Sequence, residues 1–264
     1  MEQAKHRAHT INLLVYSGEE ASSACVHHAV ETLKCVLEPY YAVTTVSKKA
    51  LLSEPWMTKT SALVFVGDSD QLYTQGCGSV VSKIQDFVRQ EGGGFIGMCA
   101  GGTLGASRCE IYSDTSTMRV FRGKTLCFYP GVARDLAFPN AESKSHHSAK
   151  VVTLNTDNGT NVKSYYKSAF SFISPESYGN VEVLARYSEV KGEMVIEAED
   201  KNEESRDAAV VLCKDGAGTA LLIGPQLEKV PEILLAQKER SAYETCVLKE
   251  LTWDNENRKK FLRN

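Results

Sequence analysis

The sequence is short of the features that mark several whole classes of protein. Lysine and arginine total 30 against 33 aspartate and glutamate residues, a net charge of −3, so nothing in the charge favours a nucleic-acid partner. No apolar run approaches the ~20 residues that span a bilayer, and the polar first ten residues lack the apolar core of a signal peptide. We therefore expect a cytoplasmic protein with no nucleic-acid partner and no membrane partner.

Cysteine is present but follows no metal-binding or disulfide pattern. The eight cysteines are scattered without a CxxC pair or a regular spacing. Neither a zinc site nor a disulfide framework is expected from such an arrangement. We predict no bound metal and no cofactor, and we expect most cysteines to be small core residues or free thiols.

Strand-like and helix-like segments alternate through the first half of the chain. Buried-strand patterns occur at 11–16, 61–67 and 95–98, with helical periodicity at 24–37 and 79–90. This alternation predicts an α/β fold with a mostly parallel sheet flanked by helices. Extra short strands, antiparallel in this interpretation, are expected in the second half at 125–129, 149–155, 168–173, 181–187, 208–214 and 219–224.

One domain is expected over residues 11–264, because no internal repeat and no second hydrophobic core is evident. Residues 1–10 are predicted to form a flexible tail. The segment 189–207 carries eight acidic residues and few apolar anchors, which predicts a mobile acidic surface insertion. Residues 229–262 are expected to form one or two C-terminal helices.

The stretch "FIGMCAGG" places Cys99 between a predicted strand and a predicted helix. Ligands of α/β sheets bind beyond the carboxyl ends of the strands. Small residues at Ala100, Gly101 and Gly102 permit the sharp turn and close backbone approach of a nucleophile elbow. The Ala100 N–H would then face the site and stabilise an oxyanion. The simpler interpretation is a tight turn into which a cysteine merely fits.

The stretches "LLVYSG", "GGGFIGMCAGG", "CFYPG", "AAVVLC" and "GPQLE" follow one another in this order. Together with residues 27–67, they resemble the amino-terminal domain of fungal-type biotin–protein ligases. That domain is similar to class I glutamine amidotransferases, so the resemblance implies a flavodoxin-like, amidotransferase-like fold from about residue 11 onward. The "GRGRxG" and "KWPND" motifs of the ligase half do not occur, so we expect no biotin transfer by this chain, whether it is a short protein or an excised domain.

The resemblance fails at the catalytic base. In the amidotransferase pattern a histidine and a carboxylate follow a late strand, and the matching stretch here is "LLIGPQLE". Gln226 stands where the histidine is expected, and Glu228 stands where the carboxylate is expected. Glutamine cannot accept and return a proton near neutral pH. All six histidines lie in the first 147 residues, and His146 and His147 would have to reach the site from a loop.

Three loops that carry glycine in the resembled family have changed as well. The Pro-Gly-Gly expected after the 61–67 strand reads Val66-Gly67-Asp68, and an Asp68 carboxylate directed at the site would repel a developing oxyanion. Asp135 stands where "FYPGVARDLAF" is expected to carry glycine. The segment "YYKSA" at 165–169 replaces "YYNGG".

These losses lead to the main hypothesis, a catalytically degenerate amidotransferase-like protein that acts as a binding or regulatory module. Cys99 would be a vestigial nucleophile, and whether the chain turns over any substrate stays open. The partner would be an unidentified protein or a small molecule at the Cys99 cleft. Tyr129 and Tyr166, with Tyr73 and Tyr165, are candidate walls of such a cleft, although aromatic residues of this kind more often belong to the core.

The alternative hypothesis is a cysteine-dependent enzyme or redox sensor. Intracellular-protease and glyoxalase-like enzymes of the PfpI type share this fold and place a glutamate from the loop after the first strand against the cysteine sulfur. The corresponding loop, "LLVYSGEEASS", offers Glu19 or Glu20 as the partner of Cys99. The competing interpretation is that these two carboxylates only favour the start of the next helix.

Overall fold

The structure is a computed structural model. It describes residues 12–67, 73, 76–112, 118–121, 125–135, 150–166, 169–188, 208–236 and 242–263. The predictions for the 1–10 tail, the 189–207 insertion, Asp68, His146 and His147 lie outside the described residues.

The first half of the chain forms a parallel sheet with helical connections, as the alternation of patterns predicts. Its strands are β1 (Asn12–Tyr16), β2 (Ala42–Val46), β3 (Thr60–Gly67) and β4 (Gly94–Cys99), in the order β2-β1-β3-β4. The connecting helices are α1 (Ser23–Leu37), α2 (Lys48–Ser53), the 3-10 turns η1 (Met57–Lys59) and η2 (Cys77–Ser79), and α4 (Val81–Arg89). After β4 comes the short helix α5 (Ala100–Gly105).

The chain after α5 extends this sheet with mainly antiparallel strands. β13 (Gly218–Ile223) pairs parallel with β4 and antiparallel with β12 (Ala208–Asp215), so it joins the two halves. The path continues through β10 (Phe170–Phe172), β7 (Tyr129–Asp135), β5 (Ala106–Tyr112) and β6 (Met118–Phe121). A branch from β12 holds β11 (Val181–Tyr187), β8 (Lys150–Thr156) and β9 (Asn161–Tyr166), and the turn η4 (Pro175–Ser177) precedes β11. The predicted fold class is confirmed.

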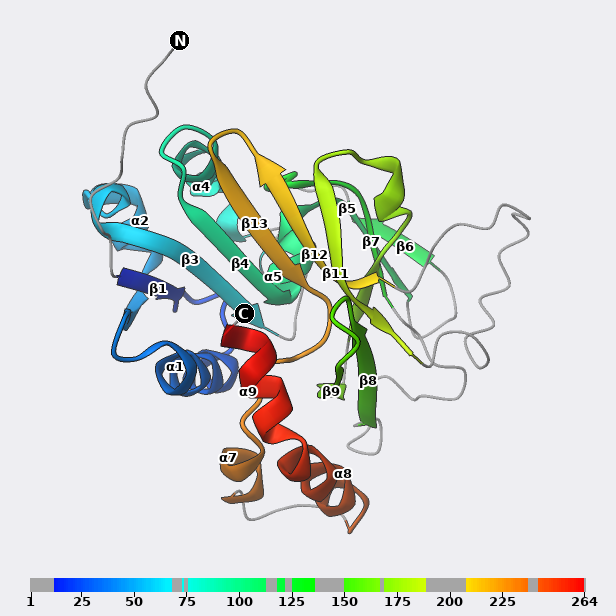
Figure 1. Ribbon diagram of the computed structural model, residues 1–264. Helices are drawn as coiled ribbons and strands as arrows, with labels where there is room; N and C mark the ends of the chain where they lie inside the picture. Colours follow the sequence, from blue (N-terminus) through cyan, green and yellow to red (C-terminus); the bar gives the residue numbers. More distant parts are fainter. Residues whose placement is uncertain are drawn as a thin grey trace.

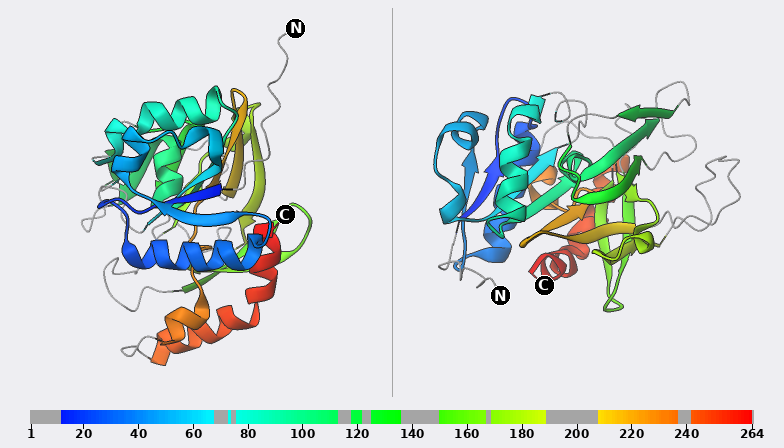
Figure 2. Two further views of the ribbon diagram at one scale, coloured as in Figure 1. Left: turned by 90° about the vertical axis from the view of Figure 1, so that its left-hand side faces the viewer. Right: turned by 90° about the horizontal axis from the view of Figure 1, so that it is seen from above.

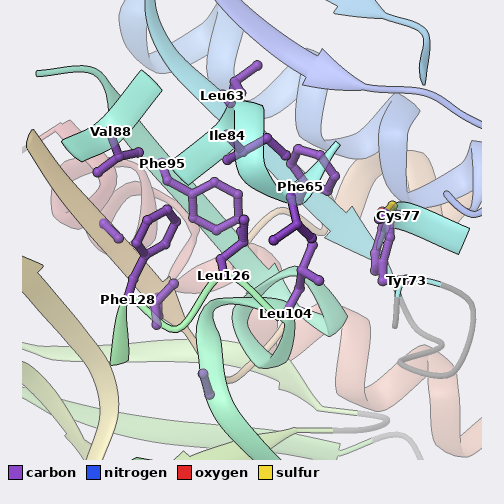
Figure 3. Close-up of a cluster of buried hydrophobic side chains, with 14 of the residues drawn as sticks. Leu63, Phe65, Tyr73, Cys77, Ile84, Val88, Phe95, Leu104, Leu126 and Phe128 are labelled. Atoms are coloured by element: carbon purple, nitrogen blue, oxygen red, sulfur yellow. The ribbon is translucent and has the colours of Figure 1, made fainter. Parts of the chain in front are cut away.

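Helices cover both faces of the central sheet, with α1 on one face and α4 on the other (Figure 2). The alternation of side chains along β3 explains this arrangement. Leu63 and Phe65 belong to the core beneath α4, whereas Val64 and Val66 belong to the core beneath α1. Figure 3 shows the α4 side, where Phe65, Phe95 and Phe128 pack together. Among the described helices none is long and apolar enough to cross a membrane.

The strand predicted over 125–129 is wrong except at its last residue. Cys127 has a φ of 52°, which interrupts an extended backbone. Leu126 and Phe128 are buried, and their N–H groups donate to the carbonyls of Leu104 and Gly105 at 2.9 and 2.8 Å. This segment therefore docks on α5, and the sheet resumes only at Tyr129.

Within the residues that the structure describes, the C-terminal segment forms three helices, where one or two are expected from the sequence. They are α7 (Pro231–Ala236), α8 (Ala242–Trp253) and α9 (Asn255–Arg263). α9 returns to the body of the protein and packs against α1 and β9 (Figure 1). The C-terminal helix thus lies beside the first helix of the chain.

Candidate functional site

The carboxyl edge of the parallel sheet brings together Gly67, Cys99 and the residues that follow β13. Gly67 at the end of β3 is the register partner of Cys99 at the end of β4. On the other side Ile223 pairs with Met98, so the residues after β13 also lie next to Cys99. This is the edge at which α/β sheets place their ligands.

Cys99 has an unusual backbone at this edge. Its φ of 52° and ψ of −112° lie outside the regions that L-residues ordinarily occupy, and α5 begins at the next residue. Such a conformation persists only where the surrounding structure imposes it. The sharp strand-to-helix turn expected from the sequence is present.

Glycines around this turn allow the backbones to touch. A Cβ on Gly101 would lie 1.9 Å from the carbonyl oxygen of Phe65 in β3, and one on Gly97 would lie 2.3 Å from the carbonyl oxygen of Gly101. A Cβ on Gly102 would lie 2.8 Å from the Ile223 carbonyl oxygen. The glycine-rich pattern is therefore required by the packing of α5 on β3, β4 and β13.

The Cys99 side chain is buried. The residue is 1% exposed and packs in a cluster with Cys109 and Phe170, which we call the Cys99 cluster. Burial raises the pKa of the Tyr166 and Tyr187 phenols, and proximity to Cys99 contributes to both increases. The Tyr187 hydroxyl donates to the Phe170 carbonyl oxygen at 2.9 Å. Cys99 thus lies in a buried cluster and interacts electrostatically with two tyrosine phenols.

Two of the tyrosines proposed as walls of the cleft, Tyr129 and Tyr73, lie in the core beneath α4. Tyr129 is fully buried in the core beneath α4, and its hydroxyl donates to the Ile173 carbonyl oxygen. Tyr73 is also in that core, against Phe65, with its hydroxyl on the Val66 carbonyl oxygen. Tyr166, another of the tyrosines proposed as walls, has an electrostatic contribution from Cys99.

Asp135, which replaces an expected glycine, also approaches this region. It is the register partner of Phe170, a member of the Cys99 cluster. Its charge contributes to the raised pKa of Tyr166, after burial. A carboxylate therefore stands close to the tyrosine that borders Cys99.

Gln226 lies just beyond β13 and its backbone pairs with β9. It forms an isolated antiparallel bridge with Tyr165, whose carbonyl accepts from the Gln226 N–H at 3.4 Å. The side chain is 2% exposed, and its Oε1 accepts no hydrogen bond from any residue that the structure describes. The amide at the expected base position is therefore buried.

Glu228 is fully buried beside an arginine from the C-terminal helix. Burial lowers the pKa of Arg258, and the carboxylates of Glu232 and Glu228 oppose that decrease. The Arg258 guanidinium donates to the Leu227 carbonyl and, at 2.7 and 3.0 Å, to Asn255 Oδ1. The charge of Glu228 thus acts on Arg258, and the same guanidinium donates to the carbonyl of Leu227, the residue before Glu228.

The segment that carries both residues, here called the 226–230 loop, is fastened to α1. Thr32 Oγ1 donates to the Glu228 carbonyl oxygen at 2.9 Å. Lys229 Nζ donates to Cys25 Sγ at 3.2 Å, and the Val230 N–H donates to His28 Nδ1 at 3.1 Å. α1, α9 and the loop therefore share one polar junction.

Of the two histidines that the structure describes, His28 lies at this junction and accepts a hydrogen bond from Val230. Burial lowers its pKa to about 4, with smaller contributions from the charges of Lys229, His27 and Arg258. A neutral ring is what allows Nδ1 to accept from Val230. This contact could not be found from the sequence, because nothing in the helical pattern of α1 indicates which loop will dock on it.

The alternative hypothesis places Glu19 or Glu20 against the Cys99 sulfur, but the contacts described for these two glutamates are different. Glu19 is exposed. Glu20 accepts from the Tyr16 hydroxyl at 2.5 Å and pairs with Lys48 Nζ at 2.7 Å. Burial alone would raise the pKa of Glu20, but the hydrogen bonds from Lys48 and Tyr16 lower it. The nearby thiol is Cys77, whose pKa rises to about 11 because of burial, with a smaller contribution from the charge of Glu20.

No group of three or more His, Cys, Asp or Glu side chains suited to a metal ion occurs within the described ranges. The strained Cys99 turn, the buried amide of Gln226 and the carboxylate of Glu228 beside Arg258 remain the chemically notable features of the sheet edge.

A crystal structure of a glutamine amidotransferase has a similar fold. The TM-score is 0.50 at 18% identity, and the match covers 85% of this chain and 95% of that structure. An uncharacterized protein of Chlamydia muridarum is 28% identical over 234 residues, which cover 86% of this chain and 84% of the relative. At 18% identity the amidotransferase likeness shows the fold alone.

A biotin–protein ligase of Schizosaccharomyces pombe is 30% identical over 219 residues. The match covers 81% of this chain but only 33% of the relative, so the chain corresponds to about a third of that ligase. Residues 11–264 match the family described as biotin-protein ligase, N terminal. The chain therefore belongs to the biotin–protein ligase N-terminal domain family.

Proposed function

We propose that this chain is a catalytically degenerate amidotransferase-like domain that acts as a binding or regulatory module. The observation that carries the proposal is the absence of a proton-accepting side chain at the expected base position in the 226–230 loop. At the place of a base this loop holds the buried amide of Gln226, which cannot relay a proton. Of the six histidines in the sequence, the two that the structure describes both lie on α1, and His28 accepts from the backbone of Val230.

The position of Glu228 supports the same conclusion. In a cysteine hydrolase a carboxylate orients the imidazole of the base. Here the carboxylate lies near Arg258, which is 3% exposed and needs a compensating charge. This placement supports a contribution of Glu228, together with Glu232, to the charge balance around Arg258 rather than a catalytic role.

The environment of Cys99 agrees with a vestigial nucleophile. Its strained strand-to-helix turn is the backbone form that a nucleophile elbow requires. The residue is nevertheless 1% exposed, so a substrate would have to displace Cys109 or Phe170 to reach the sulfur. The carboxylate of Asp135, opposite Phe170, also adds negative charge near Tyr166, which borders Cys99.

The alternative, a cysteine-dependent enzyme or redox sensor, needs a carboxyl group of Glu19 or Glu20 at the Cys99 sulfur. The strained backbone of Cys99 is the observation in its favour. The carboxylate of Glu20 is instead engaged by Lys48 and Tyr16. We therefore place this function second.

Ammonia release from glutamine tests the main proposal. The purified chain and its Cys99→Ala variant should give the same rate as buffer, because no described group can serve as the base. A rate above buffer that disappears in Cys99→Ala would refute catalytic degeneracy. A Glu19→Gln, Glu20→Gln double variant that changes the alkylation rate of Cys99 by iodoacetamide would instead support the redox alternative.

The regulatory part of the proposal has its own test. Because one relative is a biotin–protein ligase, the activity that we propose to be regulated is biotin–protein ligation. Adding the purified chain to a biotin–protein ligase reaction should change the rate of biotinylation in a saturable manner. An unchanged rate at all concentrations would contradict this role and leave the glutamine result unaffected.

A further inference from the structure

A lysine and a cysteine meet at the junction of α1 and the 226–230 loop. Lys229 Nζ lies 3.2 Å from Cys25 Sγ, although the two residues are 204 positions apart in the sequence. Cys25 is fully buried in the first turn of α1, and Lys229 is half-buried. We propose that this pair is an oxidative modification site, at which a peroxide joins the two side chains through a sulfur–nitrogen bond.

The neighbouring contacts hold the two groups in reacting distance. On one side Val230 donates to His28 at 3.1 Å, and on the other Thr32 donates to the Glu228 carbonyl at 2.9 Å. Both contacts connect α1 to the residues that flank Lys229. A nucleophile fixed close to its target reacts as if it were present at a very high concentration.

The chemistry proceeds in two steps. A peroxide first oxidises the Cys25 thiol to a sulfenic acid, and the peroxide is reduced as its O–O bond breaks. The Lys229 amine, after releasing a proton to solvent, then attacks the sulfur and forms the S–N bond, while the sulfenic hydroxyl leaves as water. With hydrogen peroxide, thiol, ammonium and peroxide give the S–N product, two water molecules and one proton.

Burial directs the sulfenic acid toward the lysine. Sulfenic acids are ordinarily captured by a second thiol, which gives a disulfide. A small peroxide reaches a buried sulfur through local opening of the junction, but a bulky thiol is held away by the apolar neighbours of Cys25, among them Val26 and Ala29. The exposed cysteines, Cys35, Cys127 and Cys246, have no such protection and should form mixed disulfides instead.

The bond would fix the 226–230 loop to α1 by a covalent link one residue after Glu228. The junction already relies on several hydrogen bonds across the same interface. The inference is independent of the proposed function, because it holds whether or not Cys99 turns over a substrate. It makes the loop that lacks the catalytic base sensitive to peroxide.

Peptide mass spectrometry of the peroxide-treated full chain tests the proposal. After treatment with hydrogen peroxide in the presence of glutathione, trypsin should yield a species that joins peptides 8–34 and 215–238, uncut after Lys229. Its mass should equal the sum of the two peptides less two hydrogen atoms. It should form more slowly than the glutathione adducts of Cys35 and Cys246, since Cys25 is buried.

Lys229→Arg and Cys25→Ser are the matched variants. Both should lose the joined species, and Lys229→Arg, which keeps the charge, should leave Cys25 as a sulfenic or sulfinic acid. Circular dichroism of each variant establishes that it is folded. The proposal would be overturned if Cys25 stays reduced while the exposed cysteines react, if Cys25 is oxidised in the wild type without the joined species, or if the joined species retains an oxygen atom.

Discussion

A buried histidine makes the stability of this domain depend on pH. The pKa of His28 falls to about 4 in the folded chain, against an ordinary value of 6.5. Between these values the unfolded chain binds more protons, so stability is lost as the pH falls from about 6.5 toward 4. Each tenfold change in proton affinity corresponds to about 1.4 kcal/mol. After partial screening by solvent, the free energy of unfolding should therefore fall by about 2 kcal/mol across this range.

Urea titrations at pH 7 and pH 4.5 measure this loss. His28→Gln should flatten the pH dependence, because an amide oxygen can still accept from Val230 but does not titrate. His27→Gln is the matched control, since His27 is exposed on the same helix. Equal pH dependence in the two variants would show that His28 is not the responsible group.

A single methyl group at Gly101 should disrupt the packing of α5 on β3. Its Cβ would lie 1.9 Å from the Phe65 carbonyl oxygen, and the neighbouring atom is backbone rather than a movable side chain. Gly101→Ala should therefore cost more than about 3 kcal/mol or prevent folding. Gly179→Ala, where nothing lies within 4 Å of the new Cβ, should shift the urea midpoint only slightly. Similar midpoints for the two variants would contradict the tight packing of α5.

At the scale of whole elements, a buried guanidinium joins α9 to the body of the protein, beside the apolar contacts of Phe261 and Leu262. Arg258 is 3% exposed and donates to Leu227, Asn255 and Thr32. Removing one partner of a buried charged network typically costs about 3–5 kcal/mol. Arg258→Met should therefore loosen both α9 and the 226–230 loop, which share these contacts.

Amide hydrogen exchange resolves where that loosening occurs. In Arg258→Met, protection should fall in residues 226–230 and 255–263 while the strands β3 and β4 keep theirs. Lys260→Met provides the control, because Lys260 is exposed on the same helix. Loss of protection confined to α9 would show that the arginine does not support the loop.

The sequence predicts an element when its pattern is local, and it fails when the element depends on a partner from a distant segment. β3 and β4 are continuous apolar runs in a sheet covered on both faces, and such runs are visible without knowledge of their neighbours. β7 reads "YPGVARD", and its Arg134 is tolerated because Glu110 of β5 pairs with it at 2.7 Å. No local pattern reveals that partner, so the sequence does not predict this strand.

The same distinction applies to the candidate site. The turn at Cys99 and the substitution at Gln226 are local features of the sequence, and the structure places both at the edge where β4 and β13 end. Arg258, His28 and the Cys25–Lys229 contact depend on the docking of segments about 200 residues apart. They could not be predicted, because the helical pattern of α1 does not indicate which distant segment packs on it, and arginine and lysine side chains are ordinarily exposed.

For the molecule as a whole, β13 is the connection between the parallel and the antiparallel strands. Leu222 at its centre is fully buried and lies in the core against the Gly105 backbone of α5. Leu222→Ala should lower the free energy of unfolding by about 3 kcal/mol. Because both halves depend on this strand, far- and near-ultraviolet circular dichroism should still report one coincident transition.

Thr219→Ala is the control on the same strand, since Thr219 is exposed, and it should change the midpoint little. Two separated transitions in Leu222→Ala would mean that the antiparallel strands form an independent unit.

The place of β13 in the sheet also sets a delay during synthesis on the ribosome. β4 is complete at residue 99, but the strand that covers its free edge begins at residue 218. At about 5–20 residues per second, the intervening chain of roughly 120 residues takes on the order of 10 s to translate. During that interval the nascent protein presents an unpaired strand edge rich in apolar side chains. A folding helper that shields this edge until β13 emerges would therefore raise the yield of native protein more than one that acts after release.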